Sequence, residues 1–257
     1  MDALKLSIVI PVLDEAGNLE RLLPGLRSMA PGAEVIVADG GSRDGTREVV
    51  ASAGWPRLVG SRPGRARQMN AGAAAAGGDV LLFLHADTRM PEGFEAAIRA
   101  ALVEPAMVGG RFDVAFDNPA PAFRMIAAFM NRRSRLSKIS TGDQAIFVRR
   151  GAFEALGGYP DIPLMEDVEL TRRLKRLGRL ASLRLRVVTS ARKWEREGVA
   201  RTIVLMWTLR FLYCCGVRPE RLHRWYYPGR PLPGAQASSP SPFQGEGRGE
   251  GGAVKPS

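Results

Sequence analysis

Short apolar runs alternate with amphipathic stretches through the first hundred residues of the chain. The runs that predict strands are 6–12, 34–38 and 80–84. The stretches that predict helices are 18–28, a segment following the turn at 42–46, and 91–102, which begins with a proline. The third strand is almost wholly apolar, as a strand buried on both faces of a sheet should be. This βαβαβ alternation predicts an α/β fold with a mostly parallel, doubly wound sheet whose strand ends meet on one rim.

The pattern changes after Val108. Residues 109–116 alternate polar and apolar side chains, which predicts a half-exposed strand. Further predicted elements are a helix at 121–131 with a basic continuation, a short strand at 145–148 and an amphipathic helix at 167–177. From 231 onward the chain consists mainly of Pro, Gly, Ser and Gln, which predicts a disordered tail. We therefore expect an α/β domain over 1–195, a C-terminal helical segment over 196–230 and a tail over 231–257.

The most apolar helix of the chain is predicted at 198–217. Its core, 202–217, contains Arg210 and is shorter than the about 20 residues that a membrane span needs. Arginine and aromatic side chains lie in and around it: Arg196, Arg201, Arg218, Arg221, Arg224, Trp207, Trp225, Tyr226 and Tyr227. This composition favours a helix lying in the interface of an anionic membrane, and a helix packed on the sheet is the alternative that the sequence leaves open.

The net charge and the cysteine content indicate the kind of partner and the cellular compartment of the protein. The 257 residues carry a formal net charge of +11, which favours anionic partners such as nucleotide phosphates or acidic lipid headgroups, with plain solubility as the alternative. Cys214 and Cys215 are adjacent and fit no metal-spacing motif, which favours core or interfacial positions in a reducing compartment. The first residues run straight into a strand without a signal-peptide pattern. We expect a cytoplasmic protein, with peripheral contact to the inner face of the plasma membrane as a further expectation.

Four acidic groups stand out along this pattern. Three of them follow a predicted strand: Asp14-Glu15, Asp39 and Asp87. Because ligands of open α/β sheets bind outside the carboxyl ends of the strands, these three are expected to share a metal and phosphate site. The fourth, Glu166-Asp167, opens a helix and is either a catalytic base or a pair stabilised simply by the helix dipole. Gly142-Asp143-Gln144 is a candidate for the neighbouring wall of the site that binds the acceptor.

The strongest single motif is Asp39-Gly40-Gly41-Ser42. Its glycines let the backbone approach a ligand closely, and an Asp at a strand tip can accept hydrogen bonds from a base or a ribose hydroxyl. The alternative is an Asp-Gly turn that only connects a strand to a helix. The motif is not a Gly-x-Gly-x-x-Gly fingerprint, which disfavours a nicotinamide cofactor.

Two further motifs carry chemistry. His85-Ala86-Asp87 places an imidazole and a carboxylate at a strand end, where they suit Mn²⁺ or Mg²⁺, or else form a capped turn. The basic segment 62–72 contains Arg65, Gln68 and Asn70, whose donors suit phosphates, or else it is a solvated loop.

The ordered set of motifs resembles family-two glycosyltransferases of the GT-A fold over roughly residues 6–177. The motifs that carry the resemblance are Pro11-Val12-Leu13-Asp14-Glu15, Asp39-Gly40-Gly41-Ser42, Leu84-His85-Ala86-Asp87-Thr88 and Glu166-Asp167. The segments 64–70 and 142–144 are similar to those of a small bacterial, non-processive subgroup. This chain departs from the family at His85, where Asp is frequent, and the Gln-x-x-Arg-Trp motif of processive synthases is absent.

The resemblance implies an inverting, metal-assisted transfer of one sugar from a nucleotide-diphosphate sugar, with a UDP-sugar favoured, to a hydroxyl of a small-molecule or lipid-linked acceptor. Asp167 is the expected base with Glu166 as its rival, and Asp87 is the expected ligand of Mn²⁺ or Mg²⁺, with His85 as a second candidate. The residues expected to bind the donor are Pro11, Val12, Glu15, Asp39, Gly41, Arg65, Gln68 and Asn70. Those expected to bind the acceptor are Gly142, Asp143 and Gln144.

Two other functions fit parts of the pattern. A nucleotidyltransferase that makes sugar nucleotides would carry a Gly-rich basic loop after the first strand, where this chain has Val12-Leu13-Asp14-Glu15. A nonenzymatic nucleic-acid-binding protein would explain the charge but not the ordered carboxylates, and no RNA- or DNA-binding motif occurs. We therefore expect no nucleic-acid partner.

Overall fold

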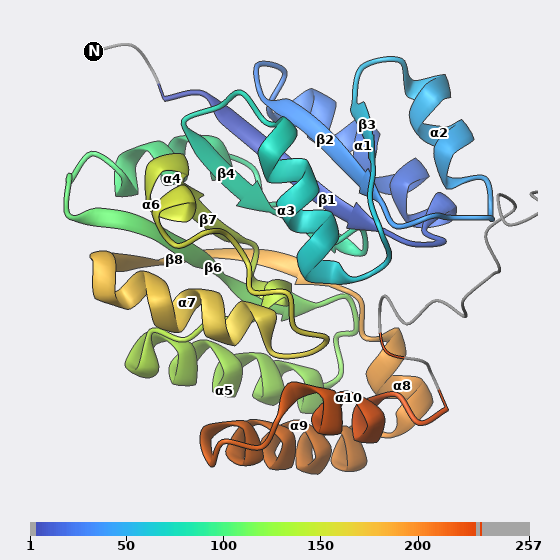
Figure 1. Ribbon diagram of the computed structural model, residues 1–257, viewed down its shortest axis with the longest axis vertical. Helices are drawn as coiled ribbons and strands as arrows, with labels where there is room; N and C mark the ends of the chain where they lie inside the picture. Colours follow the sequence, from blue (N-terminus) through green and yellow to red (C-terminus); the bar gives the residue numbers. More distant parts are fainter. Residues whose placement is uncertain (1–3, 230–231, 233–257) are drawn as a thin grey trace, which may run out of the picture.

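An eight-stranded sheet forms the centre of the molecule (Figure 1). The computed structural model describes residues 4–229 and 232. The strands are β1 (Leu6–Val12), β2 (Glu34–Asp39), β3 (Arg57–Gly60), β4 (Val80–Phe83), β5 (Thr88–Arg89), β6 (Met107–Phe116), β7 (Ile146–Arg149) and β8 (Arg179–Thr189). Their order across the sheet is β3-β2-β1-β4-β7-β6-β8-β5, and four of the seven pairings are parallel. The predicted α/β fold with a mostly parallel sheet is confirmed.

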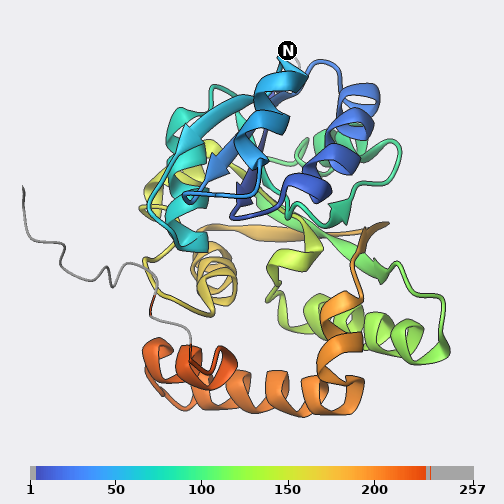
Figure 2. The same ribbon diagram turned by 90° about the vertical axis from the view of Figure 1, so that its right-hand side faces the viewer.

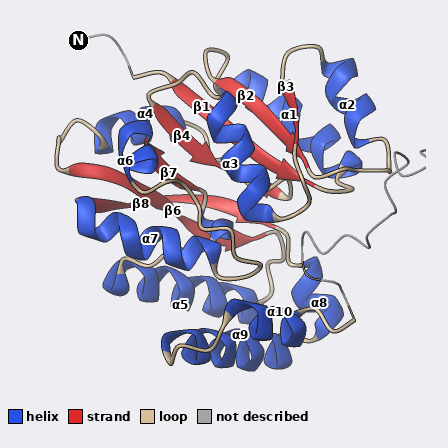
Figure 3. Cartoon of the chain, viewed as in Figure 1, coloured by secondary structure: helices blue, strands red, loops and turns tan. Residues whose placement is uncertain are grey.

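Helices cover both faces of this sheet (Figure 3). They are α1 (Ala16–Met29), α2 (Thr46–Ala53), α3 (Arg65–Ala75), α4 (Phe94–Ala101), α5 (Pro121–Ser137), α6 (Arg150–Ala155), α7 (Glu166–Leu177), α8 (Arg192–Glu197), α9 (Val199–Cys214) and α10 (Pro219–Tyr226), with a 3-10 turn η1 (Gly142–Gln144). Ile8 and Ile10 of β1 share one core with α1, α4 and α5, while Val9 shares the other with α3, α6 and α7. Because β1 is buried on both faces, it needs apolar side chains at successive positions.

Several elements differ from those predicted. The segment 62–72 is not a solvated loop, because most of it forms α3, and the basic continuation after residue 131 extends α5 to Ser137. The strands β3, β5 and β8 and the short helices α6 and α8 were not predicted. Strand β8 carries arginines between its apolar residues and is exposed over 184–186, so its sequence shows no clear apolar run.

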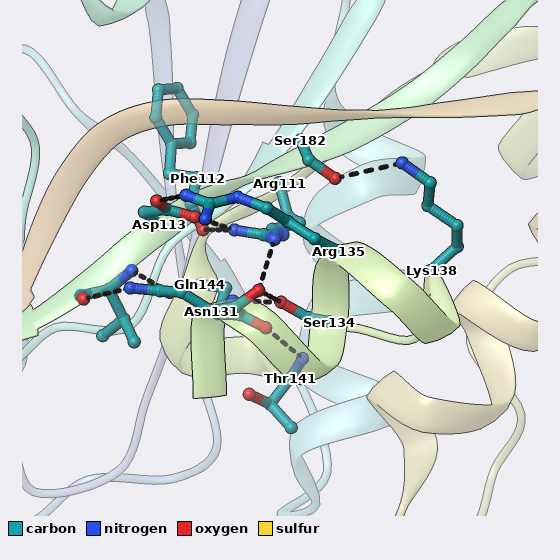
Figure 4. Close-up of polar contacts among 11 residues, drawn as sticks. Arg111, Phe112, Asp113, Asn131, Ser134, Arg135, Lys138, Thr141, Gln144 and Ser182 are labelled. Atoms are coloured by element: carbon teal, nitrogen blue, oxygen red, sulfur yellow. Dashed lines mark hydrogen bonds and ion pairs between the residues drawn. The ribbon is translucent and has the colours of Figure 1, made fainter. Parts of the chain in front are cut away.

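Strand β6 is buried, so the prediction of a half-exposed strand over 109–116 was wrong. Arg111 and Asp113 are 2% and 3% exposed, and the Arg111 guanidinium donates a hydrogen bond to the Asp113 carboxylate (Figure 4). Arg135 of α5 donates to the second carboxylate oxygen. The charged positions of β6 therefore form an internal ion pair and do not mark a solvent-exposed face. Buried charges of this kind are tolerated when they are paired and hydrogen-bonded.

The same polar network connects η1 to α5 and β6 (Figure 4). The Asn131 side chain donates to the carbonyl of Val114 in β6 at 2.9 Å and accepts from its N–H at 2.8 Å. Ser134, one turn further along α5, accepts a hydrogen bond from Gln144 Nε2 at 3.0 Å. Helix α5 thereby fixes η1 relative to the sheet.

Helices α9 and α10 lie beyond α5 and α7, on the side away from the sheet, and α8 connects β8 to them (Figure 2). The first turn of α9 packs against the core under the sheet, and Leu209 packs with Leu222 of α10 and with Met165. The opposite side of α9 stays exposed. One side of α9 is therefore packed against the rest of the protein, and membrane contact of its exposed side stays a prediction.

No helix in the described part of the chain is long and apolar enough to span a membrane. Cys214 and Cys215, at the end of α9, are exposed free thiols, so the prediction of core positions was wrong. The predicted domain boundary between residues 195 and 196 falls inside α8. The predicted disordered tail over 231–257 lies outside the described residues, apart from Leu232.

The Asp113→Ala variant is expected to lower the free energy of unfolding by about 3–5 kcal/mol, because the buried Arg111 guanidinium loses its carboxylate. Denaturant unfolding at neutral pH measures the change. The control is Asp161→Ala, which removes a more exposed ion pair to Arg67 and should cost at most about 1 kcal/mol. Equal losses in both variants would contradict this account of β6.

Candidate active site

The loops that carry the predicted motifs meet at one edge of the sheet. Strands β1 and β2 run parallel, with Val12 opposite Asp39 where both strands end. Strand β4 pairs in parallel with β1, Phe83 lying opposite Val9, so the loop after β4 leaves at the same edge. Strand β7 is antiparallel to β4 with Ile146 opposite Phe83, which brings the preceding turn η1 to this edge as well.

Side chains of the Asp39 motif fasten the loop after β2 to the loop after β1. Ser42 Oγ accepts a hydrogen bond from the backbone N–H of Asp14 at 2.9 Å. Thr46 Oγ1 accepts one from the N–H of Glu15 at 2.9 Å. Between them, Gly41 has a φ of +99°, which glycine adopts without strain. These contacts fix the backbone position of Glu15.

Asp39 is fully buried beneath this loop. Its Oδ1 accepts hydrogen bonds from the N–H and the hydroxyl of Ser42, at 2.9 and 2.6 Å, and its Oδ2 accepts from Arg47 Nε at 2.5 Å. Burial opposes ionisation of the carboxyl, but the hydrogen bonds from Ser42 and Arg47 outweigh it and lower the pKa of Asp39. The Arg47 side chain is half-exposed, so it is the part of this arrangement that a ligand can displace.

Gln68 and Asn70 of α3 bind the protein's own backbone. Gln68 Nε2 donates to the carbonyl oxygens of Val12 and Ala38, at 2.5 and 3.1 Å, and so bridges the ends of β1 and β2. Asn70 donates to the Tyr159 carbonyl at 2.8 Å and accepts from its N–H at 2.9 Å. Both side chains hold α3 and its neighbours in place.

A pocket of about 240 Å³ lies at this edge, between the strand ends and the C-terminal helices. Nine predicted site residues line it: Pro11, Glu15, Arg65, His85, Asp87, Gly142, Asp143, Glu166 and Asp167. Six predicted site residues are not part of its lining: Val12, Asp39, Gly41, Gln68, Asn70 and Gln144. Gln144, predicted to bind acceptor, is fully buried and hydrogen-bonds to Ser134 beneath η1. The structure thus separates residues that face the pocket from residues that shape its loops.

Asp167 is held in the pocket wall by two backbone groups. Its Oδ2 accepts a hydrogen bond from the N–H of Gly142 at 2.8 Å, and its Oδ1 accepts one from the N–H of Val168 at 2.7 Å. The preceding Met165 has a left-handed φ of +70°, unusual for a residue other than glycine, and α7 begins directly after it. This strained turn sets the direction in which the first residues of α7 project.

Glu166 lies beside Asp167 and is only 5% exposed. The nearest cation is Arg65, whose Nη1 is 3.9 Å from Glu166 Oε1. Burial raises the pKa of Glu166, the charge of Asp167 raises it further, and Arg65 opposes both effects. Burial also raises the pKa of Asp167, against its hydrogen bonds from Gly142 and Val168. Ionising both carboxyls of this pair is therefore less favourable than ionising two ordinary carboxyls in water.

His85 faces η1 with both ring nitrogens. Its Nδ1 lies 3.4 Å from Asp143 Oδ1, and its Nε2 packs so closely on Gly142 that a Cβ there would come within 2.4 Å. Desolvation opposes ionisation of Asp143, but the hydrogen bond with His85 outweighs it and lowers the pKa of that carboxyl. His85 Nε2 is buried and has no hydrogen-bond partner among the described residues, so the role of His85 as a metal ligand stays a prediction.

Asp87 is exposed, and Glu15 lies near it. Burial raises the pKa of Glu15, and the charge of Asp87 adds to that shift. Within residues 4–229 and 232, no three His, Cys, Asp or Glu side chains group as a metal cage. An Mg²⁺-type ion that is bound by one or two carboxylates and by substrate phosphates needs no such cage. Asp87 therefore fits a metal that shares a diphosphate.

Helices α8 and α10 supply pocket residues that the motifs did not indicate. Lys193 Nζ lies 3.6 Å from the ring centroid of Tyr226 and 5.4 Å from that of Tyr227. Burial lowers the pKa of Lys193 to about 8. Both tyrosines, predicted as flanks of an interfacial helix, line the pocket instead. Only the packing of the C-terminal helices reveals this, because the three residues form no spaced motif.

An α/β sheet with carboxylates at its strand ends and a further carboxylate pair at a helix start defines a protein of the GT-A glycosyltransferase fold. A mannosyltransferase of Pyrobaculum calidifontis, solved with GDP-Man and Mn²⁺, matches with a TM-score of 0.58 at 20% identity, over 72% of this chain and 56% of that one. A glucosyl-3-phosphoglycerate synthase of Mycobacterium tuberculosis, solved with Mn²⁺ and UDP, matches with a TM-score of 0.54 at 20% identity, over 71% of this chain and 70% of that one.

The chain belongs to glycosyl transferase family 2, whose sequence model matches residues 7–157. Succinoglycan biosynthesis protein ExoA of Rhizobium meliloti is 33% identical over 195 residues, which are 66% of this chain and 58% of that protein. A PGL/p-HBAD biosynthesis glycosyltransferase of Mycobacterium bovis is 35% identical over 170 residues, 62% of this chain and 64% of that protein. The matches thus span about three fifths of the length of these curated relatives.

The Glu166→Gln variant is expected to be more stable than the wild type at about pH 8 and similar to it at about pH 4. A carboxyl whose pKa is raised by folding binds its proton more tightly in the native state, so stability falls as pH rises and the group ionises. Denaturant unfolding at both pH values measures this. Glu48→Gln, an exposed change in α2, is the control, and a less stable Glu166→Gln at about pH 8 would contradict the account.

Proposed function

We propose that this chain is an inverting glycosyltransferase that moves one sugar from a nucleotide-diphosphate sugar to an acceptor hydroxyl. The bond between the anomeric carbon and the diphosphate oxygen breaks, and a bond from that carbon to the acceptor oxygen forms on the opposite face. The acceptor proton passes to a carboxylate, and the nucleoside diphosphate leaves.

One observation carries this proposal: Asp87, from the end of β4, and Asp167, from the start of α7, line the same pocket. A carboxylate suited to the diphosphate and a separate carboxylate suited to a proton are the two groups that such a transfer needs. Family membership and the Mn²⁺ and nucleotide bound in structures of the same fold support the proposal. Nothing comparable supports the nucleotidyltransferase, because the loop after β1 carries Asp14 and Glu15 where basic residues would be needed.

Asp167 is the better candidate for the base. Both of its oxygens are oriented by backbone N–H groups, and its side chain is less buried than that of Glu166. A base must reach the acceptor hydroxyl, so orientation and access favour Asp167. Glu166, paired with Arg65, is suited to position its neighbour and to tune its charge.

The Asp167→Asn variant is expected to lower kcat by about 10²–10⁴-fold, the usual contribution of a positioned base. The amide keeps the shape of the side chain but cannot take a proton. Initial rates of sugar transfer and calorimetric binding of the nucleoside diphosphate measure the two effects, and binding should stay near the wild-type value. Normal turnover in Asp167→Asn together with an inactive Glu166→Gln would reverse the two roles.

The donor is proposed to be a UDP-sugar bound at the strand ends. Base and ribose would lie near Pro11, Glu15 and the Asp39 loop, and the diphosphate near Asp87. Mn²⁺ or Mg²⁺ bound there would neutralise charge on the leaving diphosphate. The exposed carboxylate of Asp87 and its neighbour Glu15 support this arrangement.

Removing the metal or the Asp87 carboxylate is expected to weaken UDP binding by about 10-fold or more, the value of one charged contact. Calorimetry of UDP with Mn²⁺, with excess chelator, and with the Asp87→Ala variant measures this. Asp161→Ala is the control, because its carboxylate pairs with Arg67 outside the pocket lining. UDP affinity that is unchanged by chelator and by Asp87→Ala would exclude a metal at this position.

Peripheral membrane contact is proposed for the exposed side of α9, which would place the protein at the cytoplasmic face of a membrane. Val204 and Phe211 are 65% and 68% exposed there, and Met125 on α5 is 66% exposed. The formal net charge of +11 suits anionic headgroups.

Replacing Val204 and Phe211 by Ser is expected to reduce co-sedimentation with anionic vesicles, because the apolar contact is lost. High salt should release the wild-type protein, since the attraction is partly electrostatic. The control is Leu177→Ser, which removes an exposed leucine at the end of α7. Binding that is equal for the wild type and the double variant would argue against α9 as the membrane surface.

A further inference from the structure

A second pocket lies between α5 and α9, next to the active site. Its volume is about 240 Å³, and most of its lining is apolar. Six of the apolar side chains are Met125, Phe129, Met130, Ile203, Met206 and Trp207. We refer to it as the α5–α9 pocket. Methionine and aromatic side chains that line a pocket are typical of sites that receive a flexible apolar ligand.

Two arginines interrupt this apolar lining. Arg133 Nη2 and Arg210 Nε are both buried and have no hydrogen-bond partner among the described residues. Buried donors are nearly always satisfied, so one unsatisfied buried nitrogen on each of two guanidinium groups in the same apolar pocket favours an anionic ligand. Burial lowers the pKa of Arg133, while the nearby charges of Asp167 and Asp143 oppose that shift. Arg133 therefore lies within electrostatic reach of the proposed base.

The α5–α9 pocket continues into the active site. Asp143, Trp194, Met206 and Arg210 line both cavities. An acceptor can therefore extend from one into the other, with its apolar part between the helices and its reacting hydroxyl toward Asp167.

The outer rim of the pocket is apolar and exposed. Phe129 and Trp207 are 45% and 56% exposed, and their ring centroids are 5.0 Å apart. Val204 and Phe211, on the same helix as Trp207, continue the apolar surface. A chain longer than the pocket can thus remain in contact with apolar groups as it leaves.

We propose that the acceptor is a membrane lipid with a phosphate-bearing headgroup, whose apolar chain occupies the α5–α9 pocket and whose phosphate binds Arg133 and Arg210. This inference rests on the proposed function, because it names the acceptor class of the same active site. It also accounts for a charged residue, Arg210, in the middle of the most apolar helix. Arg133 and Arg210 are then specificity-determining residues, which act on binding of the acceptor and not on the donor.

Calorimetric titration of the full chain with decyl phosphate, below its micellar concentration, tests this directly. Wild-type protein should bind decyl phosphate, and Arg133→Gln and Arg210→Gln should each bind it about 10–100-fold more weakly, the range for one charged hydrogen bond. Arg132→Gln and Arg201→Gln, exposed neighbours on the same two helices, should bind it like the wild type. Binding should also strengthen from hexyl to decyl phosphate, because the pocket is apolar.

Three results would overturn the proposal. Equal binding of decyl glucoside would show that the phosphate is not recognised. Inorganic phosphate that binds as tightly as decyl phosphate would show that the site takes a free anion. Equal losses in Arg132→Gln and Arg201→Gln would show that net charge alone attracts the ligand. A thermal melt of each variant identifies one that is unfolded, and the chain-length series in wild-type protein then remains decisive.

UDP binding on the same samples separates this inference from the proposed function. Arg133→Gln and Arg210→Gln should bind UDP with Mn²⁺ as tightly as the wild type. Loss of decyl phosphate binding with UDP binding intact supports the acceptor assignment. Wild-type protein that binds UDP but not decyl phosphate refutes only the acceptor, and protein that binds decyl phosphate but no nucleotide refutes the glycosyltransferase.

Discussion

The candidate active site depends on the position of β4, which pairs in parallel with β1 on one side and antiparallel with β7 on the other. The antiparallel pairing places the start of β7, and so η1, at the edge where β1, β2 and β4 end. A parallel β7 would have put η1 at the opposite edge, about 10 Å or more away across a four-residue strand. Because Gly142 of η1 donates to Asp167, this one pairing also orients the proposed base.

The second constraint on this molecule is the burial of charged side chains. The same low-dielectric interior accommodates a structural ion pair between Arg111 and Asp113 and a carboxylate pair, Glu166 and Asp167, that faces the pocket. In the ion pair the opposite charges of Arg111 and Asp113 largely cancel. The carboxylate pair has only the half-exposed Arg65 nearby as an opposite charge. A fold that keeps two raised-pKa carboxylates together gives up stability near neutral pH, and groups perturbed in this way are frequent at catalytic sites.

The sequence predicted features that depend on local pattern and failed where long-range packing decides. Strand ends at Val12 and Asp39 follow from apolar runs that stop at polar motifs, and the start of α7 at Glu166 follows from helical periodicity. Periodicity could not show that Arg111 pairs inside the core, so its alternation suggested exposure. Polar residues beside a motif are equally ambiguous, and Gln144 was assigned to a ligand although it bonds to Ser134. The C-terminal helices line the pocket because they pack against elements that are far away in the sequence. Sequence spacing contains no signal for such contacts.

The strand-end pocket is proposed to be a donor and acceptor site with distinct carboxylates for each. A crystal structure of the protein with UDP and Mn²⁺ would decide this. The diphosphate and the metal should lie beside Asp87, with the base and ribose against the Asp39 loop, where Arg47 has moved aside. Asp167 should still face open space in the same pocket. UDP bound away from Asp87, or in contact with Asp167 so that no acceptor could enter, would contradict this proposal.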